Sequence, residues 1–113
     1  MPKFMAVYTG IPTNGPPPDM DEATIKRGMQ AWMDWGFRNA GSIVENGGPL
    51  GRTKKVTKAG IEDIRNHMAG YTVVEAEDHD AAAKLFEDHP HFAIFPGDGV
   101  EIMPVMPIPT MPD

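Results

Sequence analysis

The sequence has no cysteine, only one serine and no long hydrophobic run. The lack of cysteine excludes disulfides, zinc ribbons, thiol nucleophiles and iron–sulfur clusters, and it fits a cytoplasmic protein. Ser42 has no nucleophile-elbow sequence around it. No apolar segment approaches the roughly 18 residues needed to cross a bilayer. The N-terminus lacks the pattern of a signal peptide, so we expect a soluble, cytoplasmic protein.

Positive charge is also scarce. Ten Lys and Arg residues stand against 16 Asp and Glu residues, giving a net charge of −6. Nucleic-acid binding needs clustered cations, because release of counterions from phosphates supplies much of the affinity. The one basic cluster, within 52–58, is typical of a solvated strand face. We therefore predict no nucleic-acid partner.

What the chain has in abundance is glycine and proline, 12 of each among 113 residues. Such a content approaches that of low-complexity chains, but 41% hydrophobic residues and 9 Met indicate a packed interior. The length fits a single domain, 1–113. Glycine and proline gather in a loop at 10–18 and in a C-terminal arm at 104–113. The loop could be a lid or a plain connection.

Residues 19–40 are typical of an amphipathic helix. Asp19 and Glu22 have the spacing of a capping box. Gly36 lies on the apolar face, where it could allow a close approach to a sheet. The predicted core-facing residues recur at helical spacing: Ile25, Met29, Trp32, Met33, Gly36, Phe37 and Ala40.

The remaining patterns predict strands and a second helix. Apolar or β-branched runs predict strands at 3–9, 42–45, 53–57, 71–77 and 100–105. We expect 42–45 and 53–57 to form a hairpin around a turn at 46–51. Residues 59–68 are ambiguous, with one helical turn as a candidate. Asp78 should cap a helix over 78–88 that Pro90 ends.

This order predicts an α+β fold. A β-α-β-β-α-β succession is ferredoxin-like, with helices on one face of an antiparallel sheet. The strands are apolar on both faces, for example Phe4 and Met5 in the first strand. A bare apolar face predicts association, so we expect a homodimer through the sheet faces, of the dimeric α+β barrel type.

Three groups of short motifs resemble the YCII-related family, in its branch with an Asp-Gly-Pro-Phe motif. The first strand resembles the family's start, and His89-Pro90 with the segment 99–105 resembles its end. Gly48-Pro49-Leu50, then 53–55 and 70–76, resembles its hairpin and central strand. The resemblance spans nearly the whole chain. It implies a ferredoxin-like dimer with a cleft between the hairpin and the helix ends.

Functions in this family are largely unassigned, and some relatives act on lactones or chlorinated hydroquinones. In the YCII branch proper, a His in the first helix and an Asp before a Pro form the suspected catalytic pair. Here the first helix has no His, and His89 precedes the Pro. Gly47 stands where the motif of the other branch has its Asp. The family's acid–base pair therefore cannot be transferred to this chain.

His89-Pro90-His91 is the most suggestive segment for chemistry. Histidine titrates near neutral pH and suits general acid–base work, so His89 is the candidate catalytic base. Alternatively, His89 caps the end of a helix and His91 is solvated. Two His residues two apart on a strand can bind a metal, but no third ligand has a known spacing. We predict no metal site and no cofactor.

Candidate ligand-binding residues are Tyr8, Trp35, Gly48, Pro49 and His91. Each also has a purely structural interpretation, as packing or as a turn. The favoured function is a dimeric module of unassigned role that binds a small molecule or a partner protein. The alternative is a cofactor-free isomerase or lyase that acts on a lactone or another ring or carbonyl compound, with His89 as its base.

Overall fold

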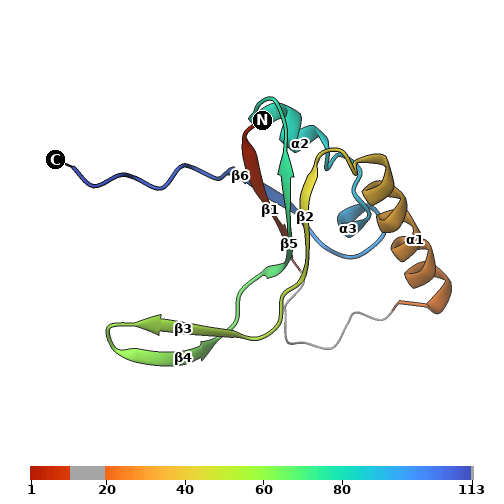
Figure 1. Cartoon of the computed structure of the whole chain (residues 1–113). Helices are drawn as coiled ribbons and strands as arrows, with labels where there is room; N and C mark the ends of the chain where they lie inside the picture. The colour runs from red at the N-terminus through yellow and green to blue at the C-terminus, as the bar shows by residue number, and fades with distance from the viewer. Residues whose placement is uncertain (11–19, 113) are drawn as a thin grey trace.

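The computed structural model describes residues 1–10 and 20–112 of the chain. The helices lie on one side of the main sheet, and a hairpin and the C-terminal arm extend away on the other side (Figure 1). The elements in these residues are β1 (Lys3–Thr9), α1 (Glu22–Arg38), β2 (Ile43–Pro49), β3 (Thr53–Thr57), β4 (Gly60–Ile64), β5 (Met68–Glu75), α2 (His79–Lys84), α3 (Pro90–Ala93) and β6 (Gly99–Pro104).

The described strands form two sheets, and the predicted α+β class is confirmed. The main sheet has four strands in the order β2-β5-β1-β6, and every neighbouring pair is antiparallel. The second sheet pairs β3 with β4 alone. The two central strands of the main sheet, β1 and β5, run side by side from Lys3↔Glu75 onward.

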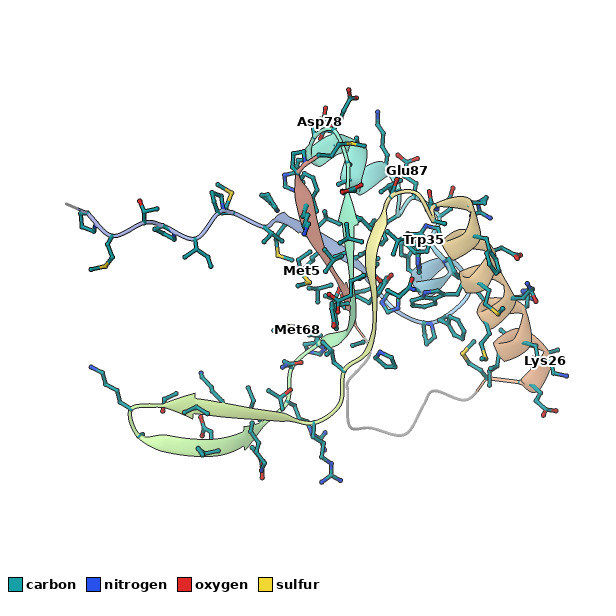
Figure 2. All side chains as sticks on the ribbon, in the orientation of Figure 1. Met5, Lys26, Trp35, Met68, Asp78 and Glu87 are labelled. Carbon is teal, nitrogen blue, oxygen red and sulfur yellow. The ribbon has the colours of Figure 1, made fainter. Side chains whose placement is uncertain are left out.

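The core lies between the main sheet and the helices. Phe4, Ala6 and Tyr8 of β1 are buried there, because alternate residues of a strand point to the same face. Met5 points to the side of the sheet away from α1, while Trp35 lies between α1 and the sheet (Figure 2). Trp35 also anchors α1 by donating its indole N–H to the carbonyl oxygen of Leu85, at 2.7 Å.

The predicted core face of α1 is largely wrong. The buried residues of the helix are Gly28 and Trp35, whereas Met29, Met33 and Phe37 are each more than half exposed. The close approach of the helix is at Gly28, because a Cβ there would lie 2.4 Å from the ring of Phe95. Nothing lies within 4 Å of such an atom on Gly36, so the close approach predicted there occurs at Gly28 instead.

The start of α1 also differs from the prediction. Asp19 and nearly all of the loop at 10–18 lie outside the described residues. Asp21 caps the helix, and its carboxylate accepts from the backbone N–H of Thr24 at 2.7 Å.

The hairpin predicted from 42–45 and 53–57 does not form. Residues 46–49 are not a turn; they continue β2 along β5, with two irregularities in register. Gly47 has a φ of +64° and lies against β5, where a Cβ would be 2.0 Å from the carbonyl oxygen of Tyr71. Glycine allows both the conformation and the approach.

The partner of β3 is β4, in the segment left ambiguous by the sequence. The helical turn considered there is wrong, because Gly60, at φ +125°, closes a tight turn between Thr57 and β4. Lys54 and Asp63 form an exposed ion pair across this hairpin at 2.7 Å. The side chains of Val56 and Ile61 are opposite each other and are both about 70% exposed.

In the segment after β5, the predicted helix cap is confirmed, but the predicted end of the helix is wrong. Asp78 caps α2 as predicted, accepting from the backbone N–H of Ala81 at 2.7 Å. Pro90 does not simply end a helix: it is the first residue of α3, whose N-cap is His89. Proline suits that position, because its fixed φ is helical and the missing N–H would have had no helical partner.

The two helix glycines provide a test of the packing. Gly36→Ala should raise the free energy of unfolding by about 0.5–1 kcal/mol, because alanine is the better helix former and the space is open. Gly28→Ala should lower it, because the ring of Phe95 must leave its packing. Urea unfolding of both variants measures the difference. Equal gains from the two substitutions would contradict this account of the helix contact.

Candidate functional site

Two adjoining cavities lie between α1 and the β2–β5 edge of the main sheet. The first, called here the main cavity, has a volume of about 540 Å³. The second, the side cavity, measures about 510 Å³ and shares Trp32, Met33, Asn46 and Thr72 with the first. The main cavity is lined by Tyr8, Met29, Trp32, Met33, Asn46, Gly48, Pro49, Ala69, Gly70, Tyr71, Thr72, His91 and Phe95.

The walls explain why the predicted core face of α1 is exposed. Met29 and Met33 line the main cavity, and Phe37 lines the side cavity. A helical apolar pattern has the same periodicity whether it faces a closed core or an open cavity. The residues assigned to the core by periodicity are therefore, in large part, cavity walls.

His91 closes the cavity against the end of β1. Its side chain is almost fully buried, so the alternative of a solvated His91 is wrong. Nε2 donates to the carbonyl oxygen of Thr9 at 2.7 Å, and the backbone N–H of Asp98 donates to the same oxygen at 3.1 Å. Gly97 packs on the edge of the imidazole, where no Cβ would fit. The end of β1, α3 and the loop before β6 are thus joined at one carbonyl group.

His89 lies deeper than His91, among aromatic rings. The backbone N–H of His91 donates to Nδ1 of His89 at 3.0 Å, so in the neutral ring the hydrogen is on Nε2. That Nε2 atom is buried and has no hydrogen-bond partner among the described residues. The ring meets Trp32 and Trp35 edge-on, with centroid distances of 4.5 and 4.6 Å. Burial first, and the nearby His91 second, lower the pKa of His89 to about 3.

These contacts give His89 a structural role. Its Nδ1 lone pair already caps α3, its side chain has no exposed surface, and it lines neither cavity. A general base needs a free lone pair within reach of a substrate proton. The geometry therefore does not support His89 as the base, and the helix that it caps is α3, at the N-terminus, rather than α2 at its C-terminus.

Tyr8 and Thr72 form a buried polar pair at the cavity wall. The Tyr8 hydroxyl lies 2.8 Å from Oγ1 of Thr72, and that Thr72 hydroxyl donates to the backbone carbonyl of Asn46 at 3.2 Å. Burial raises the pKa of Tyr8 to about 12, so its hydroxyl keeps its proton at neutral pH. Both side chains are about 3% exposed.

The sequence identified much of this lining but not all of it. Tyr8, Gly48, Pro49 and His91 come together in the main cavity. Trp35 is buried and lines only the side cavity. Sequence reasoning missed Asn46, Thr72 and Phe95, because none of them belongs to a recognisable motif. It noted Met29 and Met33 but assigned them to the core.

The lining carries no formal charge. Among the described residues, no Asp, Glu, Lys or Arg lines either cavity. The same part of the chain contains no group of three or more His, Asp or Glu side chains placed to hold a metal ion. The arrangement can enclose a mainly apolar molecule and meet it with hydroxyl, amide and imidazole groups.

The comparisons with known proteins assign no family to this chain. No protein-family model matches the sequence, and no curated protein matches it. In the described residues, no helix has both the length and the apolar character of a membrane-spanning segment.

The burial of His89 predicts acid sensitivity. The folded-state pKa of about 3 lies below the ordinary value of 6.5, so the unfolded chain binds the proton more tightly. Stability is therefore complete above pH 6.5 and is lost as the pH falls from 6.5 toward 3. The loss should be on the order of 1 kcal/mol for each pH unit in that window.

His89→Asn keeps a capping acceptor without a titrating ring, so its stability should fall less steeply with acid, although the smaller side chain lowers stability at neutral pH. His67→Asn is the matched control, because His67 is exposed and should keep the wild-type slope. Urea unfolding between pH 7 and 4 measures the slopes. Parallel slopes for wild type and His89→Asn would remove His89 as the cause.

Proposed function

We propose that this chain is a YCII-related homodimeric module that binds a small molecule in the main cavity. The observation that carries the proposal is the cavity itself, which joins apolar walls to a few buried polar groups. A volume of about 540 Å³ is in the range of small-molecule sites. Met29 and Met33 remain more than half exposed on its wall, and methionine adapts well to the shape of a ligand.

The proposed class is ferredoxin-like, and the strand order supports it. Without the β3–β4 hairpin and the short α3, the chain runs β1-α1-β2-β5-α2-β6, and its order in the sheet is β2-β5-β1-β6. Each helix then connects two strands that have a third strand between them. The resemblance of the end segments to the YCII-related family points to the same class. The lack of cysteine supports a cytoplasmic location.

The sheet face away from α1 supports the proposed dimer. Met5, Val7 and Val73 point to that face and are only half-buried, and Met103 is 40% exposed beside them. Apolar residues on three adjacent strands form a patch that water solvates poorly. A second copy of the chain, placed sheet against sheet, would cover it symmetrically.

The alternative function, a small isomerase or lyase, has less support. Its base was expected to be His89, which the helix cap and the aromatic rings enclose. A catalytic version of the proposal would need another base from the cavity wall. Binding without catalysis is therefore the function that we favour.

Binding in the main cavity can be tested with a neutral fluorescent probe, N-phenyl-1-naphthylamine. We expect its emission to rise on binding, because the apolar walls exclude water from the dye. Met33→Glu should weaken binding at least tenfold, since it puts a charge on the wall where the ligand would desolvate it. Fluorescence titration gives the dissociation constants.

Ala23→Glu is the control, because it adds the same charge to an exposed position of α1 outside both cavities. It should bind the probe like the wild type. Absence of probe binding to the wild type, or equal weakening by both substitutions, would refute the cavity as the binding site.

The proposed dimer predicts twice the monomer mass in light scattering at micromolar concentration. Val73→Glu should shift the protein to monomer, because it introduces a charge in the centre of the apolar face. Ala23→Glu, on α1, should remain dimeric. A monomeric wild type, or a dimeric Val73→Glu variant, would exclude association through this face.

A further inference from the structure

The polar groups of the main cavity have a fixed hydrogen-bond direction, which begins at Thr72. Its Oγ1 lies 3.2 Å from the backbone carbonyl oxygen of Asn46. A carbonyl oxygen only accepts, so the single hydrogen of the Thr72 hydroxyl is used in this contact. The 2.8 Å contact between Thr72 and Tyr8 must then use the hydrogen of the Tyr8 hydroxyl. Both hydroxyl hydrogens are therefore committed within the protein.

His91 has the same polarity. Its Nε2 gives its hydrogen to the carbonyl oxygen of Thr9 at 2.7 Å. In the neutral imidazole, Nδ1 is then an acceptor, and no described residue donates to it. Among the described residues, Nε2 of His89 is the fully buried side-chain polar atom that has no hydrogen-bond partner. Nδ1 of His91 also has no described partner, so it is not fully buried in the same way. What Tyr8 and His91 can offer a bound molecule is thus a lone pair.

The donors of the cavity are placed differently. The exposed Asn46 and the half-buried Trp32 line the cavity, and their amide and indole N–H groups are donors. These groups can serve an acceptor atom of a ligand. They do nothing for the buried oxygen of Tyr8 or for Nδ1 of His91. A ligand that displaces water from those two atoms without donating a hydrogen leaves them unsatisfied, which weakens binding.

From this polarity, and resting on the proposed binding function, we infer that the main cavity selects neutral ring compounds that carry a hydroxyl or N–H donor. The rings of Tyr8, Trp32 and Phe95 form apolar walls for the ring system of the ligand. The donor of the ligand would bind one buried acceptor, either the hydroxyl oxygen of Tyr8 or Nδ1 of His91. Carboxylates are rejected, because no cation lines the described part of the cavity to replace their hydration. Ligands that only accept, such as simple lactones and ethers, bind more weakly than a donor of the same shape.

The test uses three probes with one ring system: 2-naphthol, 2-methoxynaphthalene and 2-naphthoate. Calorimetry on the wild-type protein at neutral pH should rank them in that order. We expect 2-naphthol to bind about tenfold or more tightly than its methyl ether, because the naphthol hydroxyl donates its hydrogen to one of the two acceptors whereas the ether leaves both without one. Equal affinity for naphthol and ether, or preference for naphthoate, would overturn the inference while leaving the binding function intact. Failure of all three to bind would instead count against the proposed function.

Two variants identify the groups that cause the preference. Tyr8→Phe removes the acceptor oxygen and should reduce the naphthol-to-ether ratio severalfold, with little change for the ether. Thr72→Val removes the acceptor of the Tyr8 hydrogen, so that Tyr8 can donate to a ligand. It should lower the same ratio by strengthening the ether. Circular dichroism verifies the fold of each variant, and either one suffices if the other does not fold. An unchanged ratio in a folded variant would refute the role of the Tyr8–Thr72 pair.

Discussion

The hydrogen bond from the His91 imidazole to the carbonyl oxygen of Thr9 is the contact on which the site depends. It joins the end of β1 to α3, a helix of four residues that cannot hold its own position in water. Because α3 is fixed, the preceding residue, His89, is held among the aromatic rings, and Phe95, just beyond α3, reaches Gly28 of α1. The spacing of α1 from the sheet, and with it the cavity, follows from this short segment.

His89 and His91 have different roles, although they are only two positions apart. His89 is enclosed by Trp32 and Trp35 and serves as a cap and a core residue. His91, two positions further, lies at the boundary between core and cavity. Both rings lie near Tyr8 and Trp32, but they differ in their hydrogen bonds: Nδ1 of His89 caps α3, whereas Nε2 of His91 binds the end of β1. The same segment therefore stabilises the fold and supplies a polar group to the site.

Local signals in the sequence predict the parts of this fold that depend on neighbours in the chain. Asp78 as a helix cap and the buried alternation of β1 belong to this group. Features that depend on distant partners were missed. Gly47 lies along β5 instead of turning, because its fit is to Tyr71, 24 positions away. Periodicity likewise cannot separate a helix face that closes a core from one that lines a cavity.

The prolines at the two edges of the main sheet have a consequence for how molecules of this protein can meet. β2 and β6 are the edge strands, and β2 ends at Pro49 after two irregularities in register. β6 ends at Pro104, and the chain beyond it has a proline at 107, 109 and 112. Proline offers no amide hydrogen and bulges break the ladder, so neither edge is a good template for a further strand. Growth of the main sheet into open-ended fibres through these two edges is thereby disfavoured.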